Sequence, residues 1–204
     1  LETLKANQGD EEKFIRIIVS GGVSNTMLPP QNPTIIILID PEVKYPKENY
    51  ENGIGVIAVK HERYNAQAKT NNYIEGVKQA QRAERMGAFE PIYYSDNQVF
   101  EGSNSNIFAL IDNKLLTPKT NVLAGITRAV LLEILKLEIP IEIKDFTLNE
   151  LINAKEVFLT GSNKEVMPVT LIDGKRIANG KVGPVTQEVM RQFADYTHSN
   201  RWSA

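Results

Sequence analysis

Three two-residue turns, each lying between apolar segments, constrain the fold of this chain more than any other feature. Asp96-Asn97, Asp112-Asn113 and Asp173-Gly174 each separate two short runs rich in apolar residues. Asp, Asn and Gly tolerate the positive φ angles that tight hairpin turns require, so each site predicts a β-hairpin. A chain with three such hairpins is expected to pair many of its strands with antiparallel neighbours.

The remaining elements mix strands and helices without a regular β-α-β alternation. Apolar, β-branched runs predict further strands at 14–20, 34–39, 53–59, 141–144 and 156–160. Helical spacing of apolar residues predicts helices at 73–87, 126–137, 148–154 and 184–197. This order favours an α+β domain with mixed or antiparallel sheets over a doubly wound parallel one.

Charge and composition exclude several classes of function. A formal net charge of -2 without a sustained Lys/Arg cluster argues against a nucleic-acid or membrane-surface partner, so we expect a small-molecule ligand. No cysteine is present, which excludes disulfides and thiolate metal sites and makes the cytoplasm the default location. The two histidines lack ligand partners at useful spacing, so no metal is predicted.

A lysine at the end of a polar loop is the first candidate for chemistry. Lys69 follows the polar stretch 61–68 and precedes the helix expected from Tyr73. A lysine that is held on a fixed element and partly desolvated can attack an aldehyde and form a Schiff base. Taken alone, the alternative of a solvated surface charge is stronger.

An acidic residue at a strand end is the second candidate. Glu101 is followed by Gly102 and a cluster of Ser and Asn residues before the next strand. A carboxylate in this position can hold a pyridine nitrogen protonated, which makes the ring an electron sink. A simple polar turn explains the same pattern.

Two segments have the composition of anion-binding sites. Gly125, Ile126 and Thr127 open a predicted helix, where free N–H groups and the positive end of the dipole attract anions. Ser162 and Asn163 follow a strand in a small-residue loop that can bind a phosphate. An ordinary helix cap and an ordinary turn are the alternatives.

The order and spacing of these segments resemble those of the class IV (fold-type IV) aminotransferases, from about Phe14 to Tyr196. That class includes the branched-chain amino acid, D-amino acid and aminodeoxychorismate-lyase families. The resemblance implies mixed and antiparallel sheets in a pseudo-barrel flanked by helices, pyridoxal 5′-phosphate (PLP) as cofactor, and a homodimer. The family's N-terminal small domain has no counterpart here. We therefore expect residues 1–13 to end a truncated region and 14–204 to form the PLP-binding large domain.

The resemblance also implies a role for each candidate residue. Lys69 is expected to form the Schiff base and to transfer the proton between the substrate Cα and C4′ of the cofactor. Glu101 is expected to pair with the pyridine nitrogen. The other cofactor contacts that it implies are Tyr73 to the phenolic oxygen, Leu123 against the ring, and Gly125, Ile126, Thr127 and Ser162 at the phosphate.

The substrate class is less constrained. Phe14-Ile15-Arg16 resembles the aromatic-x-Arg strand of branched-chain aminotransferases, so Phe14 and Arg16 are expected to contact substrate. Asn163 is expected to contact substrate as well. The spacing from Lys69 to Asn72-Tyr73 matches the D-amino acid type better. We predict transamination of a branched-chain L-amino acid with a 2-oxo acid. The alternatives are a D-amino acid aminotransferase, an aminodeoxychorismate lyase and an inactive binding or dimerisation module.

Overall fold

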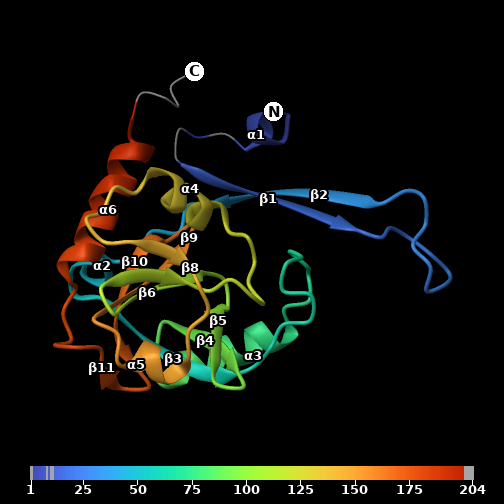
Figure 1. The fold of residues 1–204 in the computed structure, drawn as a ribbon. Coiled ribbons are helices and arrows are strands. Elements are labelled where there is room, and N and C mark those ends of the chain that lie inside the picture. The colour runs from blue at the N-terminus through green and yellow to red at the C-terminus, as the bar shows by residue number, and fades with distance from the viewer. Residues whose placement is uncertain (1, 8, 10–11, 200–204) are drawn as a thin grey trace. The chain divides into compact units, whose positions relative to one another are not determined.

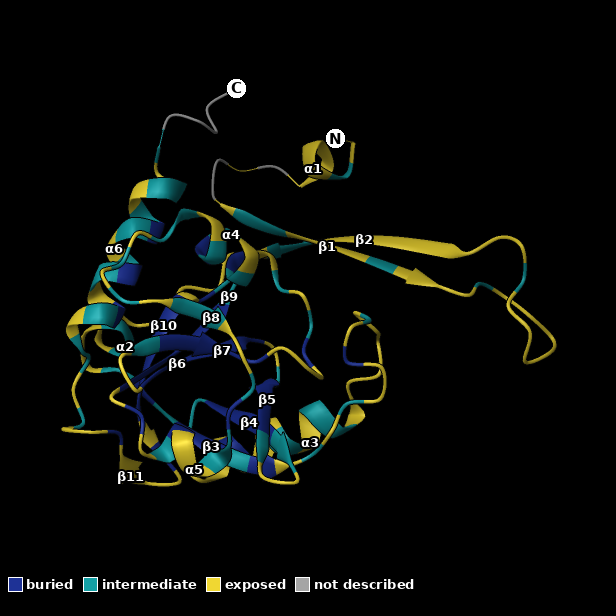
Figure 2. Ribbon diagram, in the orientation of Figure 1, coloured by how far each residue is buried: buried dark blue, intermediate teal, exposed yellow. Residues whose placement is uncertain are grey.

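The computed structural model describes residues 2–7, 9 and 12–199, and the chain divides into two compact units, 1–44 and 45–204. Unit 1 contains a short helix, α1 (Glu2–Ala6), and the antiparallel strands β1 (Lys13–Ser20) and β2 (Thr34–Pro41). Most of this hairpin is exposed in the single chain (yellow in Figure 2), and its exposed residues include Ile15, Ile17 and Ile35. The expected division at 13/14 stays a prediction, and Leu1 and 200–204 lie outside the described residues.

Unit 2 is built around one mixed sheet. Within the described residues this sheet has nine strands, joined in the order β5-β4-β3-β10-β9-β6-β7-β8, with β11 paired to β10. The strands are β3 (Ile54–Lys60), β4 (Glu90–Ser95), β5 (Gln98–Gly102), β6 (Asn106–Ile111), β7 (Lys114–Thr117), β8 (Ile141–Ile143), β9 (Glu156–Gly161), β10 (Glu165–Ile172) and β11 (Lys175–Arg176). The sheet curls into a half-barrel with helices on both sides, which confirms the predicted α+β class (Figure 1).

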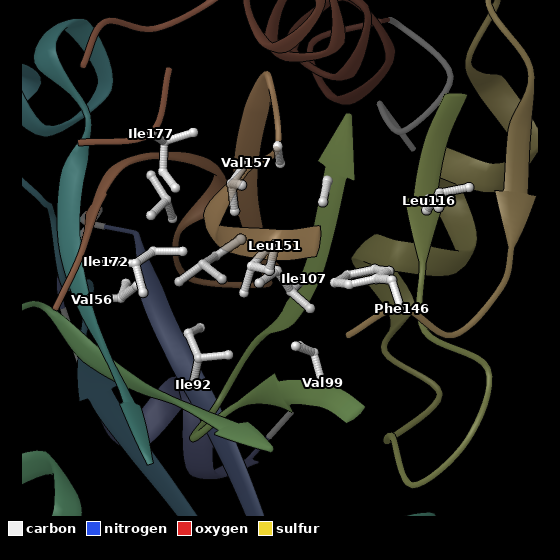
Figure 3. Packing of buried hydrophobic residues seen from close by; sticks show 14 of the residues in the cluster. Val56, Ile92, Val99, Ile107, Leu116, Phe146, Leu151, Val157, Ile172 and Ile177 are labelled. Carbon is white, nitrogen blue, oxygen red and sulfur yellow. The ribbon is translucent and has the colours of Figure 1, made fainter. Parts of the chain in front are cut away.

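The helices of unit 2 are α2 (Lys47–Asn52), α3 (Ile74–Arg85), α4 (Ile126–Ile134), α5 (Leu148–Ile152) and α6 (Pro184–Thr197). Helices α4 and α6 pack with one face of the sheet through the cluster that contains Leu131, Val189 and Phe193. Helix α5 contributes Leu151 to the cluster on the opposite face (Figure 3). Among the described residues, none of the helices has both the length and the apolar character that a membrane crossing requires.

All three predicted hairpin turns are confirmed. Asp96, Asn97, Asp112 and Asn113 have φ between 47° and 64°, and Asp173-Gly174 has φ of 50° and 74°. These positive values at both central residues are those of a type I′ turn, which suits the right-handed twist of the flanking strands.

The central strands are buried on both faces. In β9, Val157 and Leu159 belong to the cluster that contains Leu151, while Phe158 between them packs with α4 and α6. Because successive side chains of a strand point to opposite faces, both faces of β9 are covered. This double burial explains why the strands have continuous apolar runs instead of an alternating pattern.

Strand β10 continues through Pro168, although proline lacks the N–H group that a central strand normally donates. Pairing with β3 begins only at Val169, so at Pro168 the strand has β9 as its one paired neighbour. The predicted helix 126–137 ends earlier, at Ile134, because Leu135 is extended and its side chain packs against the core with those of Leu132 and Leu137. Helix α2 was not predicted.

Candidate functional site

Glu101 lies on β5 and is buried, with 3% of its surface exposed. Its Oε2 accepts hydrogen bonds from the Leu123 backbone N–H at 2.7 Å and from Asn106 Nδ2 at 3.3 Å. Its Oε1 lies 2.6 Å from Arg63 Nη2 in an ion pair. The two carboxylate oxygens therefore have different partners.

The charge of Glu101 depends on opposing effects. Burial raises the pKa of its carboxyl group, whereas the Leu123 N–H and the positive charges of Arg63 and Arg128 lower that pKa, and the net shift is upward. In turn, burial lowers the pKa of Arg128. A buried acid with two guanidinium groups near it is a perturbed group of the kind that gathers at functional sites.

The N-terminus of α4 lies next to this carboxylate. Gly125 is its N-cap, and no side chain caps the helix. An added Cβ at Gly125 would overlap Asn106 Oδ1, so the helix start packs directly on the residue that donates to Glu101. Thr127 is buried and Ile126 is 77% exposed. The first N–H groups of a helix have no partner within the helix, so this end can bind an anion.

The end of β9 lies beside the same helix start. Thr160 pairs with Asn106 across the antiparallel strands β9 and β6, so their side chains point to the same face. The hydroxyl of Thr160 is buried and has no hydrogen-bond partner. Ser162, two residues on, is exposed, and Asn163 Nδ2 donates to Tyr45 Oη at 3.0 Å. The predicted anion-binding segments are thus brought close together.

Lys69 lies in the loop between β3 and α3. The structure exposes its side chain, so the partial desolvation that we expected of a Schiff-base lysine is absent in the single chain. Tyr73 directly precedes α3 and is 47% exposed. The start of the loop is anchored by Arg63 at Glu101 and by Glu62, whose Oε1 accepts from Asn121 Nδ2 at 2.8 Å.

An open pocket of about 470 Å³ lies against this loop. It is lined by Glu62, Arg63, Tyr64, Asn65, Ala66, Gln67 and Asn121. Arg63 therefore contributes both to this pocket and to the ion pair with Glu101.

Phe14 and Arg16 lie on β1 of unit 1. Arg16 Nη2 forms an ion pair with Asp40 Oδ2 at 2.9 Å across the hairpin, and 64% of its side chain is exposed. A surface ion pair of this kind contributes at most about 1 kcal/mol to stability. The substrate contacts that we expected of Phe14, Arg16 and Asn163 stay predictions.

Three residues near the site were not identified from the sequence. Asn106 was read as one of a polar Ser/Asn cluster, and Arg63 as part of an aperiodic loop. Lys164 is 1% exposed and pairs with Glu90 and Asn104, directly after the turn that contains Ser162. The partners of Arg63 and Lys164 are distant in the chain, so no local pattern could have identified them.

The groups collected here fit one kind of cofactor. A buried carboxylate oxygen without a well-aligned hydrogen bond suits a protonated ring nitrogen, and an uncapped helix N-terminus suits a phosphate. A lysine on the adjoining loop suits an aldehyde. PLP carries all three groups. No three His, Cys, Asp or Glu side chains in the described part of the chain are grouped so as to hold a metal ion.

Comparisons with known proteins agree with this reading. The family model described as amino-transferase class IV matches residues 1–172. A Methanocaldococcus jannaschii protein named as a putative branched-chain-amino-acid aminotransferase is 34% identical, over 96% of this chain and 70% of the relative. The D-alanine aminotransferase of Staphylococcus haemolyticus is also 34% identical, over 83% of this chain and 62% of the relative. The branched-chain aminotransferase of Thermoproteus uzoniensis, solved with norvaline, has a TM-score of 0.86 and 28% identity, and the match covers 99% of this chain and 70% of that one.

Proposed function

Because this chain belongs to the class IV aminotransferases, we propose that it transfers the amino group of a branched-chain L-amino acid to a 2-oxo acid. The class of reaction, PLP-dependent transamination, follows from the family. The observation that carries the assignment to this site is the buried carboxylate of Glu101 beside the uncapped start of α4. The amino donor, the acceptor and the role of each residue are the proposal.

The cofactor residues divide by the part of PLP that they bind. Bound PLP supplies an aldehyde that takes up the amino group and a ring that delocalises the electron pair left when Cα loses its proton. Lys69 would hold the cofactor through its aldehyde and would carry the proton to and from Cα. Glu101 would bind the ring nitrogen, Tyr73 would donate to the phenolic oxygen, and Leu123 would pack on the ring.

The phosphate is bound by donors from two elements. At the start of α4 these donors would be the N–H groups of Ile126 and Thr127 and the Thr127 hydroxyl. Ser162 adds a hydroxyl from the turn after β9. Asn106 supports this part of the site because its side chain contacts both the Gly125 position and Glu101.

The branched-chain donor is supported by the apolar strand that carries Phe14 and Arg16 and by the named relatives of that type. The D-amino acid alternative keeps support from an equal identity to D-alanine aminotransferases and from the spacing of Lys69 and Tyr73. We also propose that the protein acts as a cytoplasmic homodimer. The exposed apolar residues Ile15, Ile17 and Ile35 of the hairpin are consistent with a further subunit.

The test uses the full-length protein, PLP and four amino donors: L-Leu, L-Ile, D-Ala and aminodeoxychorismate. Reduction with borohydride and mass spectrometry should find the pyridoxyl group on Lys69, with 2-oxo acid formed from L-Leu and L-Ile. Lys69→Ala should lose the attachment and at least about a thousandfold in turnover, because the covalent contact and the proton carrier disappear together. Lys60→Ala, which removes an exposed lysine of β3, is the control.

Two results would contradict the proposal. Activity with D-Ala alone would replace the branched-chain donor by the D-amino acid alternative. A full-length protein that acquires no pyridoxyl group on Lys69 would instead favour an inactive module that keeps the fold.

A further inference from the structure

Arg63 connects the loop of Lys69 to Glu101. It stands in the same loop as the lysine, and its Nη2 lies 2.6 Å from Glu101 Oε1. The same nitrogen donates to the Ala66 carbonyl oxygen at 2.6 Å, which closes a tight turn within the loop. The guanidinium group thus bridges the backbone before Lys69 and the carboxylate of β5.

The two oxygens of Glu101 differ in how they are bound. Oε2 is held by the Leu123 N–H and by Asn106 Nδ2, both with hydrogen-bond geometry. Oε1 is close to Arg63 but lacks a well-aligned hydrogen bond, and so does Arg63 Nε on the other side of the pair. An ion pair with unfilled hydrogen-bonding capacity on both sides leaves Oε1 able to accept a further donor.

The charge of Glu101 requires a cation nearby. With 3% of its surface exposed, the carboxylate has lost its hydration, which favours the neutral acid. In the described part of the chain Arg63 is the side chain that forms an ion pair with it. Arg128 acts from further away, because its Nε and Nη2 donate to Thr117 Oγ1 and the Pro118 carbonyl oxygen.

We propose that Arg63 is a positioning residue for the cofactor's ring nitrogen, acting through Glu101. The inference rests on the proposed function of Glu101. Arg63 keeps the carboxylate ionised and Oε1 directed at the ring nitrogen. Loss of its charge leaves a buried acid that is neutral more often and therefore holds the nitrogen proton less well.

The test compares two ligands in the full-length protein. One is PLP, and the other is its carbocyclic analogue, in which a C–H group replaces the ring nitrogen. This C–H group cannot be protonated, so it does not form the hydrogen bond that we propose between the ring nitrogen and Glu101. Arg63→Gln should weaken the binding of PLP about tenfold, the effect of one pKa unit in the carboxylate, and leave that of the analogue within about twofold. Arg63→Lys, which keeps the charge, should recover part of the loss.

Lys60→Gln removes an exposed cation at the end of β3 and serves as the matched control. Urea unfolding of each cofactor-free variant shows whether its fold is intact. Equal weakening of both ligands by Arg63→Gln would reduce Arg63 to a purely structural role, and unchanged PLP binding would exclude the proposal. Failure of the unaltered protein to attach PLP at Lys69 is a separate result, and it would overturn both this proposal and the function on which it rests.

Discussion

Helices α4 and α6 begin in nearly the same way but differ in what their N-termini bind. Each has a glycine N-cap in extended conformation, Gly125 with φ −67° and ψ 139° and Gly183 with φ −85° and ψ 166°, and neither has a side-chain cap at that position. At α6 the carboxylate of Glu156 accepts from the N–H groups of Val185 and Thr186 at 3.1 and 2.7 Å. No carboxylate accepts from the first N–H groups of α4 among the described contacts.

We interpret the difference as one local structure that serves two purposes. At α6 a carboxylate from β9 occupies the helix N-terminus permanently, so its dipole stabilises the fold. Near α4 the carboxylate of Glu101 accepts from the N–H group of Leu123, which precedes the helix, so it does not occupy the helix N–H groups. We therefore interpret the first as a structural anion site and the second as the site for the phosphate of the cofactor.

The largest expected effect comes from adding one methyl group at each start. An Ala Cβ at Gly125 would overlap Asn106 Oδ1, and one at Gly183 would overlap the carboxyl group of Glu156. Gly125→Ala should weaken PLP binding about a hundredfold, because it displaces the start of α4 and the amide that donates to Glu101. Gly183→Ala should instead lower the free energy of unfolding by about 2 kcal/mol.

Equilibrium dialysis with PLP and urea unfolding of the cofactor-free protein measure the two quantities. If Gly183→Ala weakened PLP binding as much as Gly125→Ala did, the two helix starts would not be functionally distinct.

The second test removes one hydroxyl from each helix. Thr127→Val should weaken PLP binding about tenfold, since a hydrogen bond to a charged group contributes roughly 1.5 kcal/mol. Thr186 Oγ1 donates to Glu156 Oε2 at 2.7 Å, so Thr186→Val should lower the free energy of unfolding by about 1–2 kcal/mol and leave PLP binding unchanged. Competition by inorganic phosphate, measured in both variants, shows whether the Thr127 effect is at the phosphate. If Thr127→Val weakened PLP binding but left competition by inorganic phosphate unchanged, the Thr127 hydroxyl would not contact the phosphate of the cofactor.

The smallest effect concerns pH. The pKa of Glu101 is raised above its ordinary value of 4.5 by burial, so the folded protein keeps this proton at pH values where the unfolded chain has lost it. The contribution of Glu101 to the free energy of unfolding therefore falls as pH rises from below 4.5 through the raised pKa. Unfolding in urea between about pH 4 and 7 should show this decline, and Glu101→Gln should remove it.

Glu133→Gln, which neutralises an exposed carboxylate of α4, controls for the loss of one charge. If the free energy of unfolding still fell with rising pH in Glu101→Gln, another titrating group would be responsible for the decline.

Local chemistry made several elements predictable. The turn at Asp112-Asn113 needs two positive φ angles, which few residue types adopt without strain. These two residues are therefore enough to predict the hairpin turn. The start of α4 at Ile126 and the position of Lys69 before α3 could also be predicted from neighbouring residues alone. The order of these segments along the chain was specific enough to indicate the family.

Contacts between distant segments were beyond such reasoning. Lys164 looks like a solvated lysine in the sequence, yet it is buried against Glu90, and Arg63 reaches Glu101 from another loop. Similarly, Pro168 lies within a central strand because its neighbour β3 pairs only from Val169. These outcomes depend on which strands the curled sheet places side by side.

The amino-acid sequence by itself determined the turns, the helix starts and the kinds of chemical group that the site contains, because each depends on the preferences of neighbouring residues. Only the tertiary structure decided that the carboxylate at 156 caps α6 while the one at 101 stays beside the open start of α4. A carboxylate binds the N–H groups that lie nearest to it in space, and sheet pairing sets that distance.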